Sequence, residues 1–206
     1  MLRPIALALT VLFQPLVMPT LVFGTLLFAV PQATTLPVEF KSRLFYVIVL
    51  STWLLPMALM LGLRWGGWIK SLHFAELAER RMPFVLVALV YVMTTAFFYQ
   101  KTELDPILWQ GMAVMTGTVV LLTGITFFWK MSAHLTGLGG LLGVIWVLSH
   151  LFTSFTPVYL LFGALLLTGL VASSRLYLHA HSPLEIYAGL AMGFVCCWLG
   201  FMWIYS

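Results

Sequence analysis

The sequence predicts an all-α membrane protein, a polytopic bundle of about six to seven transmembrane helices. Among its 206 residues, 62% are apolar and 8% are charged, and the mean hydropathy is +1.06, values that water-soluble domains do not reach. Every Lys, Arg, Asp and Glu lies between long apolar runs or at the end of one. A charge at mid-bilayer costs at least about 2.5–3.5 kcal/mol on insertion scales, so the charges mark loops and the runs between them mark spans.

Each apolar run is predicted to be a helix, because lipid offers no partners for the backbone amides of an open sheet and no barrel-type alternation is present. Most runs approach the roughly 20 residues that cross about 30 Å of hydrocarbon. In chain order they are Ile5–Val30, Leu44–Leu63, Pro83–Gln100, Pro106–Trp129, His134–Leu151, Pro157–Ser173 and Leu184–Tyr205. The first run is too long and too weakly basic at its start for a cleaved signal peptide, so we expect a retained span.

We expect one integral membrane domain over residues 1–206, because no linker, low-complexity tract or repeat divides the chain. The adjacent Cys196 and Cys197 suit neither a disulfide nor a zinc site. Glycines such as Gly139 and Gly143 favour close helix packing in lipid. The net charge of +4 fits membrane topology and anionic headgroups, and no nucleic-acid partner is expected.

Seven spans place the connections after the second, fourth and sixth helices on one membrane face. These connections hold Glu76, Glu79, Arg80 and Arg81 in the first, Lys130, Ser132 and His134 in the second, and Ser174, Arg175, His179, His181 and Glu185 in the third. Arginine donates two parallel N–H groups to phosphate oxygens, and a positioned imidazole can act as nucleophile or proton donor. We therefore expect a single site for phosphate chemistry at this end of the bundle.

The third connection has a distinctive spacing: Ser174-Arg175, five residues, His181, three residues and Glu185. It resembles the third signature of the type 2 phosphatidic acid phosphatase superfamily, which has Asp where Glu185 stands. The resemblance implies that Arg175 binds phosphate, that His181 is the nucleophile and that Glu185 orients it. A phosphatase-like core of about residues 64–205 would then include all three connections.

The other two connections are similar to the remaining signatures in part. Met131-Ser132-Ala133-His134 stands where the family has Pro-Ser-Gly-His, which implies that Ser132 and a neighbouring amide hold the phosphate and that His134 protonates the leaving oxygen. Arg81 and Pro83 stand where the family has Arg-Pro after Lys and six residues, with one residue inserted. Phe74 takes the position of that lysine, so Lys70 or Lys130 would have to supply its charge.

The resemblance implies hydrolysis through a phosphohistidine at His181, with Arg81, Arg175 and Lys130 neutralising the phosphoryl oxygens and with no metal or other cofactor. Lipid phosphates and isoprenoid diphosphates are the expected substrates, since their headgroups reach water while their tails stay among membrane lipids. The expected location is the bacterial cytoplasmic membrane. The excess of Lys and Arg favours the cytoplasmic face for the site, whereas many bacterial relatives work on the periplasmic face, so both sides stay open.

Other interpretations of these residues remain open. Glu185 also completes a helix-capping box that begins at Ser182, and the arginines could anchor helix ends to lipid headgroups. His73 and His150 are expected to be interfacial or structural, and His179 does not fit the signature spacing. The chain could also be an inactive relative that serves as a membrane subunit or lipid-binding scaffold, or a small transporter.

Overall fold

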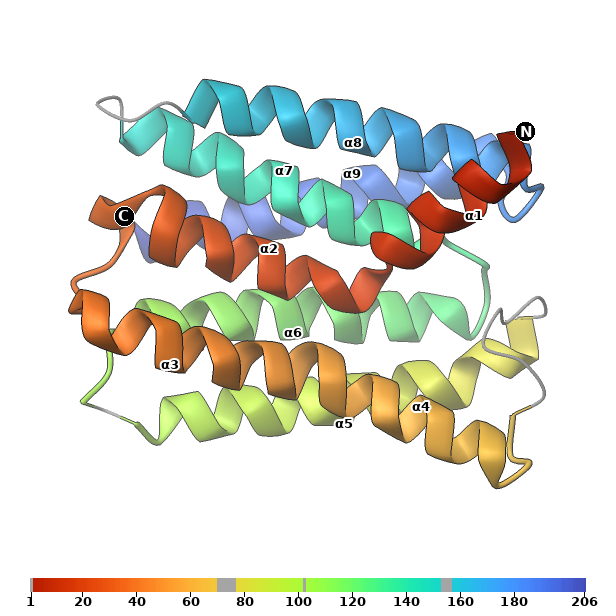
Figure 1. Cartoon of the computed structure of the whole chain (residues 1–206), viewed down its shortest axis with the longest axis horizontal. Coiled ribbons are helices and arrows are strands. Elements are labelled where there is room, and N and C mark those ends of the chain that lie inside the picture. Colours follow the sequence, from red (N-terminus) through yellow and green to blue (C-terminus); the bar gives the residue numbers. More distant parts are fainter. Residues whose placement is uncertain (1, 70–76, 102, 153–156) are drawn as a thin grey trace.

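The computed structural model describes residues 2–69, 77–101, 103–152 and 157–206, and within these ranges the regular structure is helical throughout. Figure 1 shows the helices running back and forth along one direction. The α-helices are α1 (Leu2–Leu12), α2 (Met18–Gly24), α3 (Val38–Val49), α4 (Leu55–Trp65), α5 (Leu77–Tyr99), α6 (Ile107–Thr126), α7 (Ala133–Leu151), α8 (Pro157–Tyr177) and α9 (Pro183–Ile204). Short 3-10 or π turns are η1 (Pro15–Val17), η2 (Thr25–Ala29), η3 (Pro31–Ala33) and η4 (Leu50–Leu54).

Six helical stretches of the described chain are long and apolar enough to cross a membrane, and a bent pair at the N-terminus brings the total to as many as seven. This is the architecture of an integral membrane protein, and it confirms the predicted all-α bundle. The second predicted run is longer than expected: α3, η4 and α4 form a continuous stretch from Val38 to Trp65. The end of α4 and the start of α5 lie at the same end of the bundle as the α6–α7 and α8–α9 connections (Figure 1), as the span count predicts.

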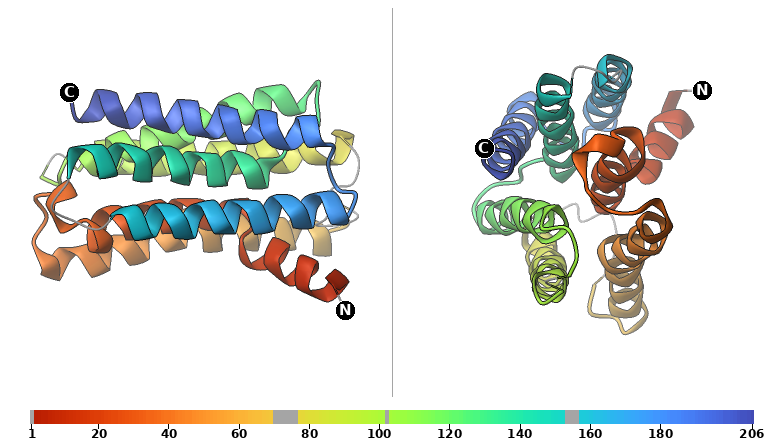
Figure 2. Two further views of the ribbon diagram at one scale, coloured as in Figure 1. Left: turned by 90° about the horizontal axis from the view of Figure 1, so that it is seen from above. Right: turned by 90° about the vertical axis from the view of Figure 1, so that its left-hand side faces the viewer.

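The first predicted run is not one straight helix. Its two parts, Leu2–Leu12 and Pro15–Ala29, are bent by 43°, and Figure 2 shows α1 leaving the direction of the bundle. Pro15 causes the break, because its ring disfavours a helical conformation at the preceding residue. Gln14 is accordingly extended, with φ −64° and ψ 154°. The first predicted run, Ile5–Val30, is therefore a bent pair of helices, which brings the number of candidate spans to seven if the pair crosses the membrane as one span.

A proline also shapes the second span. Pro56 lacks the N–H that would bond the Thr52 carbonyl one turn earlier, and a π turn precedes it over Leu50–Leu54. The buried hydroxyl of Tyr91, on α5, donates to that carbonyl at 3.3 Å. The polar contact between the two helices therefore compensates the backbone defect that the proline creates.

We expect Tyr91→Phe to lower the free energy of unfolding by about 1 kcal/mol, because it removes a buried hydrogen-bond donor. In a Pro56→Ala background the same change should have a smaller effect, since alanine restores the missing backbone donor at this position. Unfolding of the single and double variants in sodium dodecyl sulfate would measure this coupling. Equal effects of Tyr91→Phe in both backgrounds would contradict the assigned compensation.

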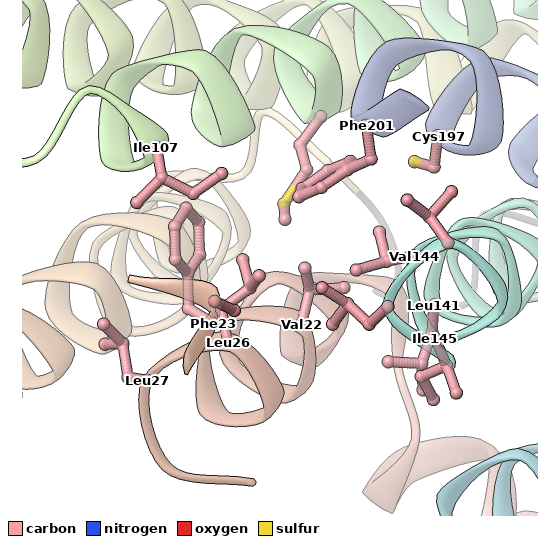
Figure 3. Packing of buried hydrophobic residues seen from close by; sticks show 14 of the residues in the cluster. Val22, Phe23, Leu26, Leu27, Ile107, Leu141, Val144, Ile145, Cys197 and Phe201 are labelled. Carbon is pink, nitrogen blue, oxygen red and sulfur yellow. The ribbon is translucent and has the colours of Figure 1, made fainter. Parts of the chain in front are cut away.

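Helix α7 lies at the centre of the core. Two-thirds (67%) of its most apolar segment is buried, compared with 28% for α9. In Figure 3, Phe23 of α2, Val144 of α7 and Phe201 of α9 meet in one cluster. Along the α7–α9 contact, a Cβ at Gly139 would overlap the Leu190 carbonyl, and a Cβ at Gly143 would approach the Phe194 carbonyl to 2.6 Å. Because Gly139 and Gly143 have no side chains, the parallel helices α7 and α9 approach closely, and their N-termini lie side by side.

Candidate functional site

The candidate site lies where α7 and α9 begin, α8 ends and α5 begins (Figure 1). The backbone N–H of Ser132, just before α7, donates to the Glu185 carbonyl in the first turn of α9 at 3.2 Å. Gly189 allows this approach, since a Cβ there would lie 2.7 Å from the Ser132 carbonyl. Two helix N-termini therefore converge, and the positive ends of their dipoles favour an anion.

His181 is held in one orientation by two acceptors. Its Nδ1 lies 2.9 Å from Oε2 of Glu185 and 3.1 Å from the backbone carbonyl of Lys130. Because a carbonyl and a carboxylate only accept hydrogen bonds, Nδ1 carries the proton and donates to both. In the neutral ring, Nε2 then keeps its lone pair, as a nucleophile or base requires. Sequence spacing predicts the contact with Glu185, and the contact with Lys130 comes from packing.

Glu185 combines the two roles that the sequence left as alternatives. Its Oε2 accepts from the backbone N–H of Ser182 at 3.0 Å, and Ser182 Oγ accepts from the Glu185 N–H at 3.4 Å, which completes the capping box. The same Oε2 also accepts from His181. One carboxylate thus begins α9 and orients the imidazole.

The pKa of His181 is lowered to about 4, mainly by burial; the hydrogen bond and charge of Glu185 raise it, and the positive charges of Arg175 and Arg80 lower it. We expect the ring to stay neutral above about pH 5 and to protonate only as the pH falls toward 4. If the reaction needs the neutral His181 ring, protonation of this ring should reduce activity only below about pH 5. Nitrogen NMR of labelled histidine would show the midpoint, and a midpoint near 6.5 would contradict the assigned environment.

His134, in the first turn of α7, is joined to the N-terminal helix. Its Nε2 lies 3.1 Å from the backbone carbonyl of Thr10 and must donate to it. Thr10 lies in the last turns of α1, whose final carbonyls have no partner within the helix because the chain turns away at Gln14. The break before Pro15 therefore frees the carbonyl that orients His134, and Nδ1 is the ring nitrogen left for a substrate.

The arginine that enters the site from α5 is Arg80, whereas the family resemblance indicates Arg81. Arg80 is 5% exposed, donates to the Met131 carbonyl at 3.1 Å, and acts electrostatically on His134 and His181. The exposed Arg81 side chain instead donates to the Phe127 carbonyl at 2.9 Å. Successive helical residues point about 100° apart, so only one of the two can face the site.

Three buried side-chain polar atoms have no hydrogen-bond partner in the described part of the chain: Oγ1 of Thr20 on α2, away from the site, and Oγ of Ser132 and Nε of Arg175 within it. Ser132 is fully buried and stands at the N-cap of α7, yet its hydroxyl does not cap the helix. Buried polar atoms are nearly always bonded, so the Ser132 hydroxyl and the Arg175 Nε–H are available to a ligand that accepts hydrogen bonds.

The charges of the site point to the same kind of ligand. Arg80 and Arg175 lie within electrostatic range of each other and of Glu185, so two positive charges face one negative charge. Uncompensated charge is costly away from water, and a bound anion would relieve it. The site therefore combines excess positive charge, unpartnered donors and two imidazoles.

The structure brings together His134, His181, Glu185, Arg175 and Ser132 among the residues expected from the sequence. Lys130 contributes its backbone carbonyl, and Lys70, His73 and Glu76 lie outside the described residues. His150 lies at the opposite end of α7. Within the described ranges, no three His, Cys, Asp or Glu side chains are grouped in a way that could hold a metal ion.

Fold and site together define a helical integral membrane protein with a largely buried, positively charged cluster of side chains at one end of its bundle. Comparisons with models of protein families, with curated proteins and with solved structures find no match.

Proposed function

We propose that this protein is a membrane phosphatase that hydrolyses a lipid phosphate or isoprenoid diphosphate through a phosphohistidine at His181. The observation that carries the proposal is the pairing of an oriented imidazole with unpartnered donors. Nδ1 of His181 is bound by Glu185 and Lys130, while Ser132 Oγ and Arg175 Nε are buried without partners. This is the arrangement that a nucleophile beside a phosphoryl group requires.

In the proposed reaction, Nε2 of His181 attacks phosphorus, and the bond from phosphorus to the leaving oxygen breaks. His134, protonated on Nδ1, gives that proton to the leaving oxygen. Water then attacks the phosphohistidine, its proton passes to His134, and the P–N bond breaks to release phosphate and restore the neutral His181 ring. Glu185 stabilises the positive charge that forms on that ring.

The cationic groups stabilise the transition state in this proposal. Arg80 and Arg175 would neutralise the equatorial oxygens, and Ser132 Oγ with the first-turn amides of α7 would donate to them. A lipid substrate fits the position of the site at the end of the bundle, where a headgroup meets water while its tail remains in lipid. We place the protein in the bacterial cytoplasmic membrane, where such lipids occur.

The test is phosphate release by the purified protein from phosphatidic acid, phosphatidylglycerol phosphate and undecaprenyl diphosphate. We expect at least one substrate to be turned over and His181→Ala to reduce its turnover by about 10³-fold or more, because the nucleophile is gone. His150→Ala, at the opposite end of α7, is the matched control and should retain activity. Turnover by His181→Ala comparable to that of the control would reject the assigned nucleophile.

A second candidate is a lipid-phosphate-binding subunit that lacks catalysis. One observation favours it: Nε2 of His134 is already bound to Thr10, so only Nδ1 could serve as the proton donor. Binding of a lipid phosphate with no release of inorganic phosphate, under conditions where the wild-type protein is folded, would support this candidate over the phosphatase.

A further inference from the structure

A half-open hollow lies where the start of α1 meets the end of α8 (Figure 1). Its volume is about 370 Å³, and Arg3, Tyr177, Leu178 and His179 line it. Tyr177 is the last residue of the candidate membrane span in α8. Because spans end where the hydrocarbon meets the lipid headgroups, the hollow lies at headgroup level.

The hollow faces the surrounding lipid and is separate from the candidate site. Arg175 acts on the two site histidines, and Tyr177 follows it by two residues, so the two side chains leave α8 about 200° apart. Tyr177 instead shares a helical face with Phe162, Leu166 and Leu170, which are exposed and precede it at spacings of four and seven residues. We call this face the lipid-facing stripe of α8. The hollow is at the end of the stripe.

The side chains around the hollow suit an anion. Arg3 forms no ion pair within the described ranges, and no Asp or Glu is among the described residues that line the hollow. The guanidinium of Arg3, the phenol of Tyr177 and the imidazole of His179 can each donate a hydrogen bond to a phosphate oxygen. A cation at headgroup level attracts anionic lipids.

The turn that ends α8 brings His179 to the hollow. The N–H of His179 donates to the Leu176 carbonyl at 2.9 Å, and that of Ala180 to the Arg175 carbonyl at 3.1 Å, which is the pattern of a Schellman motif. The φ of His179 is 49°, the only positive value at a described non-glycine residue. Glycine normally takes this position, so the histidine occupies a less favourable backbone conformation and in return supplies a donor to the hollow.

We propose that the hollow binds the phosphodiester headgroup of an anionic phospholipid, whose acyl chains lie along the lipid-facing stripe of α8. The headgroup contacts Arg3 from α1 and His179 from the end of α8. Helix α1 packs mainly against α8 and leaves the direction of the bundle (Figure 2), so the lipid joins the two helices across this contact. The proposal does not depend on the function assigned to His181.

The test measures the thermal midpoint of the purified full-length protein in dodecyl maltoside with added phosphatidylglycerol or phosphatidylcholine. We expect saturating phosphatidylglycerol to raise the midpoint by about 5 °C or more, and phosphatidylcholine, which has no net charge, by less than about 2 °C. Arg3→Gln and His179→Gly should each reduce the response to phosphatidylglycerol by at least about half. Arg43→Gln, which removes an exposed arginine of α3, is the matched control and should keep the full response.

Two further measurements separate a lost ligand from other causes. His179→Gly relieves the positive φ, so its midpoint without lipid should equal or exceed that of the wild type. Arg175→Gln removes a cation of the candidate site and should keep the response to phosphatidylglycerol. Loss of the response in Arg175→Gln, with Arg3→Gln unaffected, would place the lipid at the candidate site and overturn the proposal.

The remaining outcomes also decide. Equal responses to the two lipids, or a response to phosphatidylglycerol that neither Arg3→Gln nor His179→Gly reduces, would reject the lipid site and leave the phosphatase proposal intact. Glycerol 3-phosphate supplies a headgroup without acyl chains, and we expect it to leave the midpoint of the wild type and of Arg3→Gln equally placed. A rise with this compound that matches the rise with phosphatidylglycerol and is lost in Arg3→Gln would assign the hollow to a soluble anion instead.

Discussion

Arg80→Ala should weaken phosphate or vanadate binding by about 100-fold, whereas Arg81→Ala should change it less than threefold. Arg80 is buried and acts on both site histidines, while Arg81 bonds the Phe127 carbonyl on the exposed side of α5. Losing a preorganised cation beside a phosphoryl group typically reduces binding or rate by about 10²–10³. Equilibrium binding of orthovanadate by both variants would measure the difference.

A folding defect must be separated from a lost ligand in this experiment, because Arg80 also bonds the Met131 carbonyl. Guanidinium added to Arg80→Ala should restore part of the binding if the missing group is the cation, and it should do nothing for Arg81→Ala. Equal losses in the two variants, with matched thermal midpoints, would reject the assignment of Arg80.

Gly193→Ala should destabilise the protein by about 3 kcal/mol or more and abolish the site. A Cβ at Gly193 would overlap the Thr136 carbonyl of α7, and backbone cannot move aside as a flexible side chain can. The Ser132 N–H donates to the Glu185 carbonyl across the same α7–α9 interface, so separating the two helices would also disrupt the contacts of His181 with Glu185 and Lys130. Unfolding in sodium dodecyl sulfate and vanadate binding would report the two effects.

Helix α8 supplies the matched control for this prediction. A Cβ at Gly163 or Gly169 meets nothing within 4 Å, so alanine there should be neutral, or stabilising by up to about 1 kcal/mol through helix propensity. If Gly193→Ala were as stable as Gly163→Ala, the close α7–α9 contact would not be essential for the fold.

Helical phase explains why Arg80, and not Arg81, faces the site. Tyr91 and Phe98 are buried on α5 and follow Arg80 by about three and five helical turns, so the buried face of this helix extends back to Arg80. The linear signature, aligned on Pro83, indicates Arg81 instead. A linear signature takes no account of helical phase, so it does not distinguish between two adjacent arginines on a helix.

Hydropathy and charge were sufficient to locate the spans and to place the three polar connections at one end of the bundle. The reason is local: each span must satisfy its backbone and exclude charge within its own residues. The contact between His181 and Glu185 can also be predicted from the sequence, because the two residues lie within five positions at the start of one helix.

Contacts between distant segments decided the rest. The Thr10 carbonyl that binds His134, the Lys130 carbonyl that binds His181 and the choice of Arg80 depend on how α1, α5 and α7 pack. No spacing in the chain encodes these contacts, because the partners are brought together by the close approach of helices and by the break before Pro15. The tertiary structure is likewise needed to show that Ser132 Oγ and Arg175 Nε are buried without hydrogen-bond partners, because this depends on the positions of all surrounding residues.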